Sequence, residues 1–207
     1  AIGRECRAHG VAVVLGPGVN IKRSPLCGRN FEYYSEDPLL AGKLAAGFIR
    51  GAEGEGVGTS LKHFAVNNQE TLRMSVSAEV DERALHELYL RPFEIAVKEG
   101  APSTVMCSYN RINGVYASEN RMLLTRILRE QWGFDGLVMS DWNATEQCSY
   151  AEAIHAGNDL IMPGTPAVAK KLEADLKAGR LNREALNVSA GRVLELVFKS
   201  KTCESFL

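Results

Sequence analysis

Short apolar segments alternate with longer amphipathic segments along most of this 207-residue chain, and this alternation limits the possible folds more than any other feature. Five short segments have the composition of strands that are buried on both faces, and they cover residues 11–16, 59–66, 104–109, 136–140 and 159–162. Segments with apolar residues at helical spacing follow them, and we expect no strands joined directly by a short turn. The pattern predicts a parallel sheet covered by helices, in the α/β class.

Capping residues and glycines predict the helix boundaries. The first long helix is expected to begin at Ser35 and to end at Gly51. A turn at Asn113-Gly114 is expected to lead into a later helix. Three further helices are expected to begin at or near these residues: Asp81, Thr165 and Asn182.

Two parallel α/β architectures satisfy this order of elements, a doubly wound sheet and a (β/α)8 barrel. The chain has about five strand–helix units, whereas a barrel needs eight and typically has about 250 residues. The fold is therefore either an open sheet or a barrel of which part is missing. No low-complexity segment divides the chain, so we expect residues 1–207 to form a single domain.

Composition and charge argue against several classes of partner. The formal net charge is -1, from 24 Lys and Arg against 25 Asp and Glu, so we expect no nucleic acid and no membrane as partners. No apolar stretch is long enough to span a bilayer, and no signal-peptide pattern is present. These features predict a cytoplasmic location, unless a longer parent chain carries a signal for the periplasm or for secretion. The four histidines lack metal-ligand spacing, so neither a metal nor another cofactor is expected. Five scattered cysteines are typical of reduced thiols: Cys6, Cys27, Cys107, Cys148 and Cys203.

Polar residues follow directly on several of the predicted strands. In parallel α/β folds the chemistry lies at the carboxyl ends of the strands. Charged groups there could hydrogen-bond sugar hydroxyls, and an indole could pack against the apolar face of a pyranose, so the set is typical of a carbohydrate site. These strand ends, with the loop after the first strand, give six candidate site residues: Arg29, Lys62, His63, Tyr109, Asp141 and Trp142.

Asp141 is the principal catalytic candidate. A carboxylate fixed at a strand end beside cations would have a lowered pKa and stay ionised, as a nucleophile must. The alternative is a surface or helix-capping aspartate, but the adjacent Trp142 and the polar residues on other strands favour the catalytic interpretation. Tyr109 has packing in the core as its main alternative.

The cationic candidates also have structural alternatives. Lys62 could be a salt-bridged lysine beside a core histidine, His63. Arg29 could fix its loop through Glu32 or Glu36, and an arginine that does so can also present donors to a ligand.

Five sequence blocks in co-linear order, residues 16–42, 60–74, 105–120, 133–145 and 156–164, resemble glycoside hydrolase family 3 and specifically its bacterial β-glucosidase branch. They include SLKHFAVNNQETLRM and GFDGLVMSDWNAT. The resemblance implies a partial (β/α)8 barrel, the N-terminal domain of the family. It also implies retaining double-displacement hydrolysis of terminal β-D-glucosyl or related residues, with Asp141 as the nucleophile. Substrate-binding residues implied by the resemblance are Arg29, Lys62, His63, Tyr109 and Trp142.

Part of the machinery that the resemblance implies is absent from the chain. The segment after the Lys-His pair reads AVNNQE and lacks the catalytic-histidine loop of the N-acetylglucosaminidase branch, so the acid/base should be a glutamate of a following α/β sandwich domain. We therefore expect a truncated or split barrel whose partners are the missing strands and that domain, from the same or another chain. The alternative is a catalytically inactive carbohydrate-binding or structural remnant of such a barrel.

Overall fold

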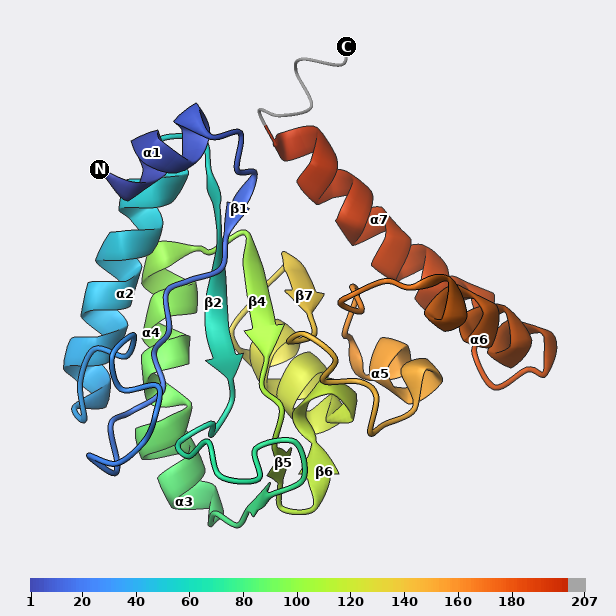
Figure 1. Ribbon diagram of the computed structural model, residues 1–207, viewed down its shortest axis with the longest axis horizontal. Helices are drawn as coiled ribbons and strands as arrows, with labels where there is room; N and C mark the ends of the chain where they lie inside the picture. The colour runs from blue at the N-terminus through green and yellow to red at the C-terminus, as the bar shows by residue number, and fades with distance from the viewer. Residues whose placement is uncertain (201–207) are drawn as a thin grey trace.

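The computed structural model describes residues 1–200 as a twisted parallel sheet with helices packed around it (Figure 1). The α-helices are α1 (Ile2–Ala8), α2 (Pro38–Glu53), α3 (Glu82–Ala84), α4 (Arg91–Gly100), α5 (Tyr150–Ala156), α6 (Pro166–Lys177) and α7 (Arg183–Lys199). The strands are β1 (Val13–Val14), β2 (Gly58–Phe64), β3 (Ser77–Ala78), β4 (Thr104–Cys107), β5 (Arg111–Ile112), β6 (Val115–Tyr116) and β7 (Leu137–Met139). Two π-helices and one 3-10 helix complete the list: η1 (Leu85–Tyr89), η3 (Met122–Gln131) and η2 (Ala117–Glu119).

The main sheet has the strand order β1-β2-β4-β7, and all its strands are parallel. Leu160 extends this order through a parallel bridge to Met139 of β7. Each strand thus lies beside the one that precedes it in the chain, and the order never reverses within the described residues. A doubly wound sheet requires such a reversal, so the structure confirms the partial (β/α)8 barrel and excludes the alternative.

Side chains of the sheet alternate between two apolar clusters. Val105 and Val138 face the cluster under the helices, together with Phe64, Phe93, Leu124 and Leu128. Met106 and Met139 belong to a second cluster, in which they pack with residues of the fifth strand segment and of α7: Leu160, Met162, Val193 and Leu196. The sheet is therefore covered on both sides near β7.

Glycines allow α2 and α4 to pack closely where they run side by side (Figure 1). A Cβ atom at Gly42 would lie 2.8 Å from Cβ of Ile95, and one at Gly100 would lie 3.1 Å from Cα of Ala46. Packed Cβ atoms do not approach as closely as 2.8 Å, so Gly42 cannot be replaced without a shift of α4, and the contact at Gly100 is tight.

The boundaries of α2 differ from those predicted. Asp37, not Ser35, is the N-cap, because its carboxylate accepts hydrogen bonds from two backbone N–H groups of the first turn. Gly51 does not end the helix, which continues to Glu53, and Ala52 in the last turn is buried beside Gly3 of α1. The other three predicted caps are confirmed as N-caps: Asp81, Thr165 and Asn182.

Residues 1–200 contain one β-hairpin, although the sequence pattern predicted none. β5 and β6 are antiparallel, and the φ angles of Asn113 and Gly114 between them are 49° and 87°. Positive φ at both central positions defines the type I′ turn, which Asn-Gly favours. The hairpin pairs with β3 in a small three-stranded sheet, and η3 begins only afterwards.

Two further expectations concern membrane spans and cysteines. No helix within residues 1–200 combines the length and the apolar character that a bilayer span needs. Cys203 lies outside the described residues. The structure has free thiols at the other four cysteines: Cys6, Cys27, Cys107 and Cys148.

Candidate active site

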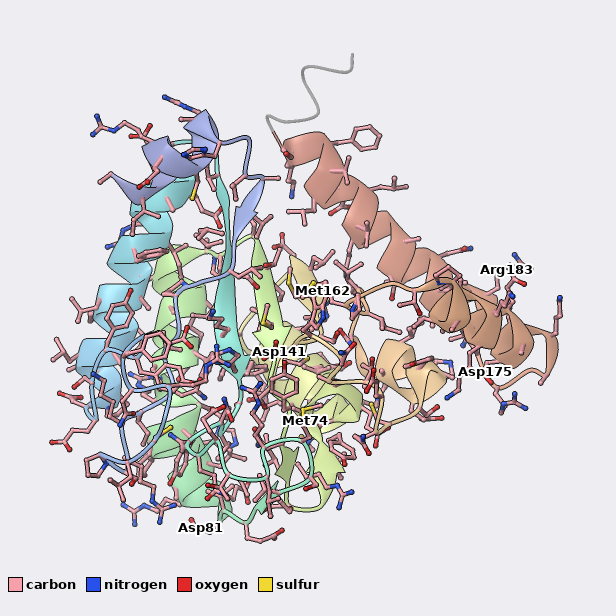
Figure 2. All side chains as sticks on the ribbon, in the orientation of Figure 1. Met74, Asp81, Asp141, Met162, Asp175 and Arg183 are labelled. Carbon is pink, nitrogen blue, oxygen red and sulfur yellow. The ribbon has the colours of Figure 1, made fainter. Side chains whose placement is uncertain are left out.

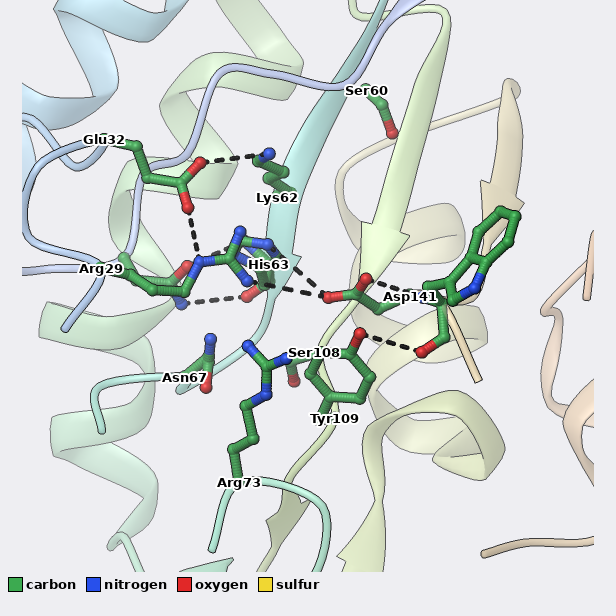
Figure 3. Close-up of polar contacts among 12 residues, drawn as sticks. Arg29, Glu32, Ser60, Lys62, His63, Asn67, Arg73, Ser108, Tyr109 and Asp141 are labelled. Carbon is green, nitrogen blue, oxygen red and sulfur yellow. Dashed lines mark hydrogen bonds and ion pairs between the residues drawn. The ribbon is translucent and has the colours of Figure 1, made fainter. Parts of the chain in front are cut away.

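The candidate residues converge at the carboxyl ends of the parallel strands (Figure 3). Lys62 and His63 lie near the end of β2, while Tyr109 and Asp141 each follow their strands, β4 and β7, by two residues. Arg29 reaches the same place from the loop between β1 and α2. The cluster lies near the centre of the molecule, as the position of Asp141 shows (Figure 2).

The two carboxylate oxygens of Asp141 have different surroundings. Oδ1 accepts a hydrogen bond from the backbone N–H of Trp142 at 2.7 Å. Oδ2 is buried and has no hydrogen-bond partner among the described residues. It faces Nε2 of His63 at 3.7 Å and Nη1 of Arg29 at 4.0 Å. One oxygen thus orients the carboxylate and leaves the other available to a ligand.

The prediction that the pKa of Asp141 is lowered is wrong. Burial raises the pKa of this carboxyl, because the charged form loses hydration. The Trp142 N–H, the Tyr109 hydroxyl and the charges of Arg29 and Arg73 act in the opposite direction but do not outweigh burial. The strand-end position could be predicted from the sequence, but the extent of desolvation could not.

His63 is a buried, neutral imidazole. Burial lowers the pKa of His63 well below its ordinary value, and the nearby charges of Arg29 and Lys62 add to the effect. Its backbone is fixed by Asn20, which accepts from the His63 N–H at 2.8 Å and donates to the His63 carbonyl at 2.9 Å. The Tyr33 hydroxyl lies 3.1 Å from Nδ1. Nε2 is therefore held in a fixed direction, toward Asp141.

Glu32 joins two of the candidate cations. Its Oε1 accepts a hydrogen bond from Nε of Arg29, and its Oε2 lies 3.1 Å from Nζ of Lys62. Both structural alternatives are thus present: Arg29 ties its loop to Glu32, not to Glu36, and Lys62 is salt-bridged. Arg29 still faces Asp141 through its Nη1, so the two roles coexist.

Arg73 belongs to the cluster but was not among the predicted residues. Its guanidinium carbon lies 4.5 Å from the centroid of the Tyr109 ring, and its Nη1 is 2.7 Å from Oε2 of Glu70. Tyr109 in turn donates from its hydroxyl to the Trp142 carbonyl at 2.9 Å. Burial raises the pKa of Tyr109 to about 12, so the hydroxyl stays protonated and acts as a donor.

Trp142 differs from the other candidates in its exposure. Its side chain is among the exposed large apolar groups, at 58%. It follows Asp141 directly in the chain, and its indole is exposed whereas the carboxylate is buried. Such a surface can pack against the apolar face of a sugar ring.

A cavity of about 590 Å³ lies next to the cluster, and Asn67 and Glu70 line it. Among residues 1–200, no group of three or more His, Cys, Asp and Glu side chains is placed to hold a metal ion. The chemistry available to these side chains is hydrogen bonding by cations and hydroxyls around one available carboxylate oxygen.

A family model described as the glycosyl hydrolase family 3 N terminal domain matches residues 1–196. The chain belongs to glycosyl hydrolase family 3. It is 51% identical to thermostable beta-glucosidase B of Acetivibrio thermocellus, over 96% of this chain and 26% of that protein. It is 49% identical to an exo-alpha-(1->6)-L-arabinopyranosidase of Bifidobacterium longum, over 99% of this chain and 27% of that protein.

Solved structures agree with this membership of family 3. Beta-glucosidase 3B from Thermotoga neapolitana in complex with glucose matches with a TM-score of 0.96 and 48% identity, over 100% of this chain and 30% of that one. A beta-glucosidase from Bifidobacterium adolescentis matches with a TM-score of 0.93 and 50% identity, over 99% of this chain and 30% of that one. The chain thus spans between a quarter and a third of these relatives.

Proposed function

We propose that this chain carries the nucleophile half of a retaining β-glycosidase site, which hydrolyses terminal β-D-glucosyl or related residues. The observation that carries the proposal is Oδ2 of Asp141, a buried carboxylate oxygen without a hydrogen-bond partner that faces His63 and Arg29. A carboxylate with one oxygen held and one oxygen unengaged is suited to attack an anomeric carbon.

In the proposed first step, Oδ2 of Asp141 forms a bond to the anomeric carbon as the bond from that carbon to the leaving oxygen breaks. An acid gives its proton to the leaving oxygen, and a covalent glycosyl-enzyme results. In the second step, water attacks the same carbon while the conjugate base takes a proton from the water. The bond between Asp141 and the carbon breaks, and the sugar leaves with retained configuration.

The surrounding residues bind and orient the sugar in this proposal. Arg29 and Lys62 offer charged N–H donors to sugar hydroxyls, and neutral His63 adds a further polar contact close to the nucleophile. Arg73, stacked on Tyr109, lines the same place with a third positive charge. Trp142 offers its exposed indole to the ring.

The acid/base is assigned to a group outside the described residues. Glu32 and Glu70 are the other carboxylates of the cluster, and each forms an ion pair with an arginine. Both carboxylates are thus occupied by ion pairs with the cations of the cluster. Retaining enzymes need a second carboxyl about 5 Å from the first, and the relatives are three to four times longer than this chain.

We infer that residues 1–207 form one incomplete barrel domain. Among the described residues, β1 pairs with β2 on one side only, and Leu160 pairs only with β7. Unpaired strand edges favour association with further strands. Strands from the rest of the parent protein, or from another chain, are the proposed occupants of both edges.

Trapping with 2,4-dinitrophenyl 2-deoxy-2-fluoro-β-D-glucopyranoside tests the proposal. Its leaving group departs without protonation, so the chain needs no acid for the first step, and fluorine slows the second. We expect mass spectrometry of peptides to find one fluoroglucosyl group on Asp141, and none in Asp141→Asn.

Two other results would contradict the proposal. A label on another residue would reassign the nucleophile. A folded chain that binds glucose but takes no label would support the alternative of a carbohydrate-binding remnant. The arabinopyranosidase relative makes the corresponding fluorinated arabinopyranoside the second probe for the accepted sugar.

A further inference from the structure

Glu32 is central to the cluster although it neither contacts Asp141 nor follows a strand. Its carboxylate lies between the Arg29 guanidinium and the Lys62 ammonium group (Figure 3). The exposed fractions of the three side chains are 19%, 19% and 13% for Glu32, Arg29 and Lys62. At this depth ion pairs are less screened by solvent and salt than pairs on the surface.

Arg29 has two anionic neighbours, and Glu32 holds it away from one of them. Its Nε donates to Glu32, whereas its Nη1 is 4.0 Å from Oδ2 of Asp141, beyond hydrogen-bond distance. A guanidinium can engage a carboxylate through two parallel N–H groups. Without the Glu32 charge, Asp141 would be the nearest anion left for Arg29.

We propose that Glu32 is a positioning residue that fixes Arg29 and Lys62 as sugar ligands and keeps Arg29 from closing onto Oδ2 of Asp141. This inference rests on the proposed function, in which Oδ2 is the attacking atom. Glu32 thus leaves Oδ2 of Asp141 without a hydrogen bond, although Glu32 itself takes no part in the reaction.

Loss of the Glu32 charge has two consequences in this proposal. Arg29 moves onto Oδ2, where its hydrogen bonds stabilise the carboxylate and make it a weaker nucleophile. Lys62 loses its partner and with it a fixed direction toward the sugar. The charged or titratable groups that face Asp141 are then Arg29, His63, Arg73 and Tyr109.

Glu32→Gln tests the proposal, with Glu94→Gln as its matched control. Glu94 on α4 also bridges an arginine and a lysine, with contacts of 2.7 Å to Arg91 and 2.7 Å to Lys98, and it is 23% exposed. The first measurement is the rate of labelling of Asp141 by the dinitrophenyl fluoroglucoside at saturation. We expect Glu32→Gln to slow it about 100-fold, as small displacements in active sites do, and Glu94→Gln to leave it unchanged.

The second measurement is the pKa of the Asp141 carboxyl. It is obtained from the ¹³C chemical shift of that carboxyl as a function of pH, in the chain without the fluoroglucoside. The Asp141→Asn variant assigns the signal. Glu32→Gln should lower this pKa by about one unit, because a negative charge leaves and a positive one approaches. Glu94→Gln should not change it. A role of Glu32 in folding alone would not produce this shift.

The outcomes separate the two proposals. If the wild-type chain takes no label at Asp141, the proposed function fails, and the chemical-shift titration still decides the role of Glu32. If Glu32→Gln has the wild-type pKa at Asp141, or the wild-type labelling rate, the positioning role is overturned. Glu32→Asp keeps the charge on a shorter side chain and serves if Glu32→Gln does not fold: an intermediate labelling rate supports the role, and the wild-type rate refutes it.

Discussion

Acidification from pH 7.5 to 5.5 should destabilise the folded chain through His63. This side chain is 1% exposed, and burial keeps its pKa in the folded state well below the ordinary value of 6.5. In the unfolded chain it titrates at about 6.5. Below that pH the unfolded state binds a proton that the folded state does not bind, so the stability present above about pH 6.5 is lost as the pH falls.

The size of the effect follows from one proton. A difference of one proton changes the free energy of unfolding by about 1.4 kcal/mol per pH unit. At pH 5.5, one unit below the unfolded-state pKa, His63 therefore costs about 1.4 kcal/mol, a sizeable part of a total stability of about 5–15 kcal/mol.

Urea unfolding at pH 7.5, 6.5 and 5.5 measures this effect in the wild type and in His63→Asn. The asparagine can keep a hydrogen bond to Tyr33 but has no proton to gain, so the wild type should lose about 1.4 kcal/mol more than the variant between the end points. Asp141, whose pKa is raised by burial, titrates with the opposite sign and lies 3.7 Å from His63, so both proteins are compared in an Asp141→Asn background. His9→Asn, at an exposed position, is the control. Parallel pH dependences of the wild type and His63→Asn would refute the reasoning.

Three further predictions concern the carboxylates and the helix packing. The labelling rate of Asp141 should fall toward acid pH with a midpoint above about 3.9, the value of an unperturbed aspartate, because burial raises its pKa; a midpoint below that value would contradict the assigned desolvation. Asp159 has a fully buried side chain between Arg129 and Arg192, so Asp159→Asn should reduce the free energy of unfolding by about 3–5 kcal/mol in urea titrations, and a loss below about 1 kcal/mol would mean that the arginines find other partners. Gly42→Ala should lower the free energy of unfolding by about 1–3 kcal/mol, since the new Cβ would lie 2.8 Å from Ile95. Gly47→Ala, on the open face of α2, should not lower the free energy of unfolding.

The parallel sheet could be predicted because its strands are short apolar runs that alternate with longer amphipathic segments, an order typical of α/β proteins. Strand direction then decides where polar residues at strand ends meet. This is why the sequence could predict that four of the candidate residues lie together, from their positions after or near the ends of β2, β4 and β7: Lys62, His63, Tyr109 and Asp141. The choice between a barrel and an open sheet required the order of the strands, since periodicity within a strand carries no information about its neighbours.

Residues in the long loops could not be placed by the same reasoning. Arg73 lies nine residues beyond the end of β2, and its position depends on stacking against Tyr109 and pairing with Glu70. Glu32 was weighed only as a local partner of Arg29, because its second contact, to Lys62, spans thirty residues of sequence. The hairpin at Asn113-Gly114 had a readable signal, and its dipeptide favours a type I′ turn over a simple entry into a helix.

The proposed nucleophile half of the site is held together by contacts within this chain. The backbone N–H of Lys62 donates to the Pro17 carbonyl at 3.0 Å, and that of Val19 donates to the Lys62 carbonyl at 2.8 Å, so β2 and the segment after β1 keep a fixed register. Asn20 then clamps His63 from the same segment. Since these bonds need no group beyond residue 200, the orientation of the sugar-binding residues and the supply of an acid are separable. An activated aryl glucoside should therefore report on this chain alone, and the ratio of its rate to that of an alkyl glucoside measures what a second carboxyl contributes.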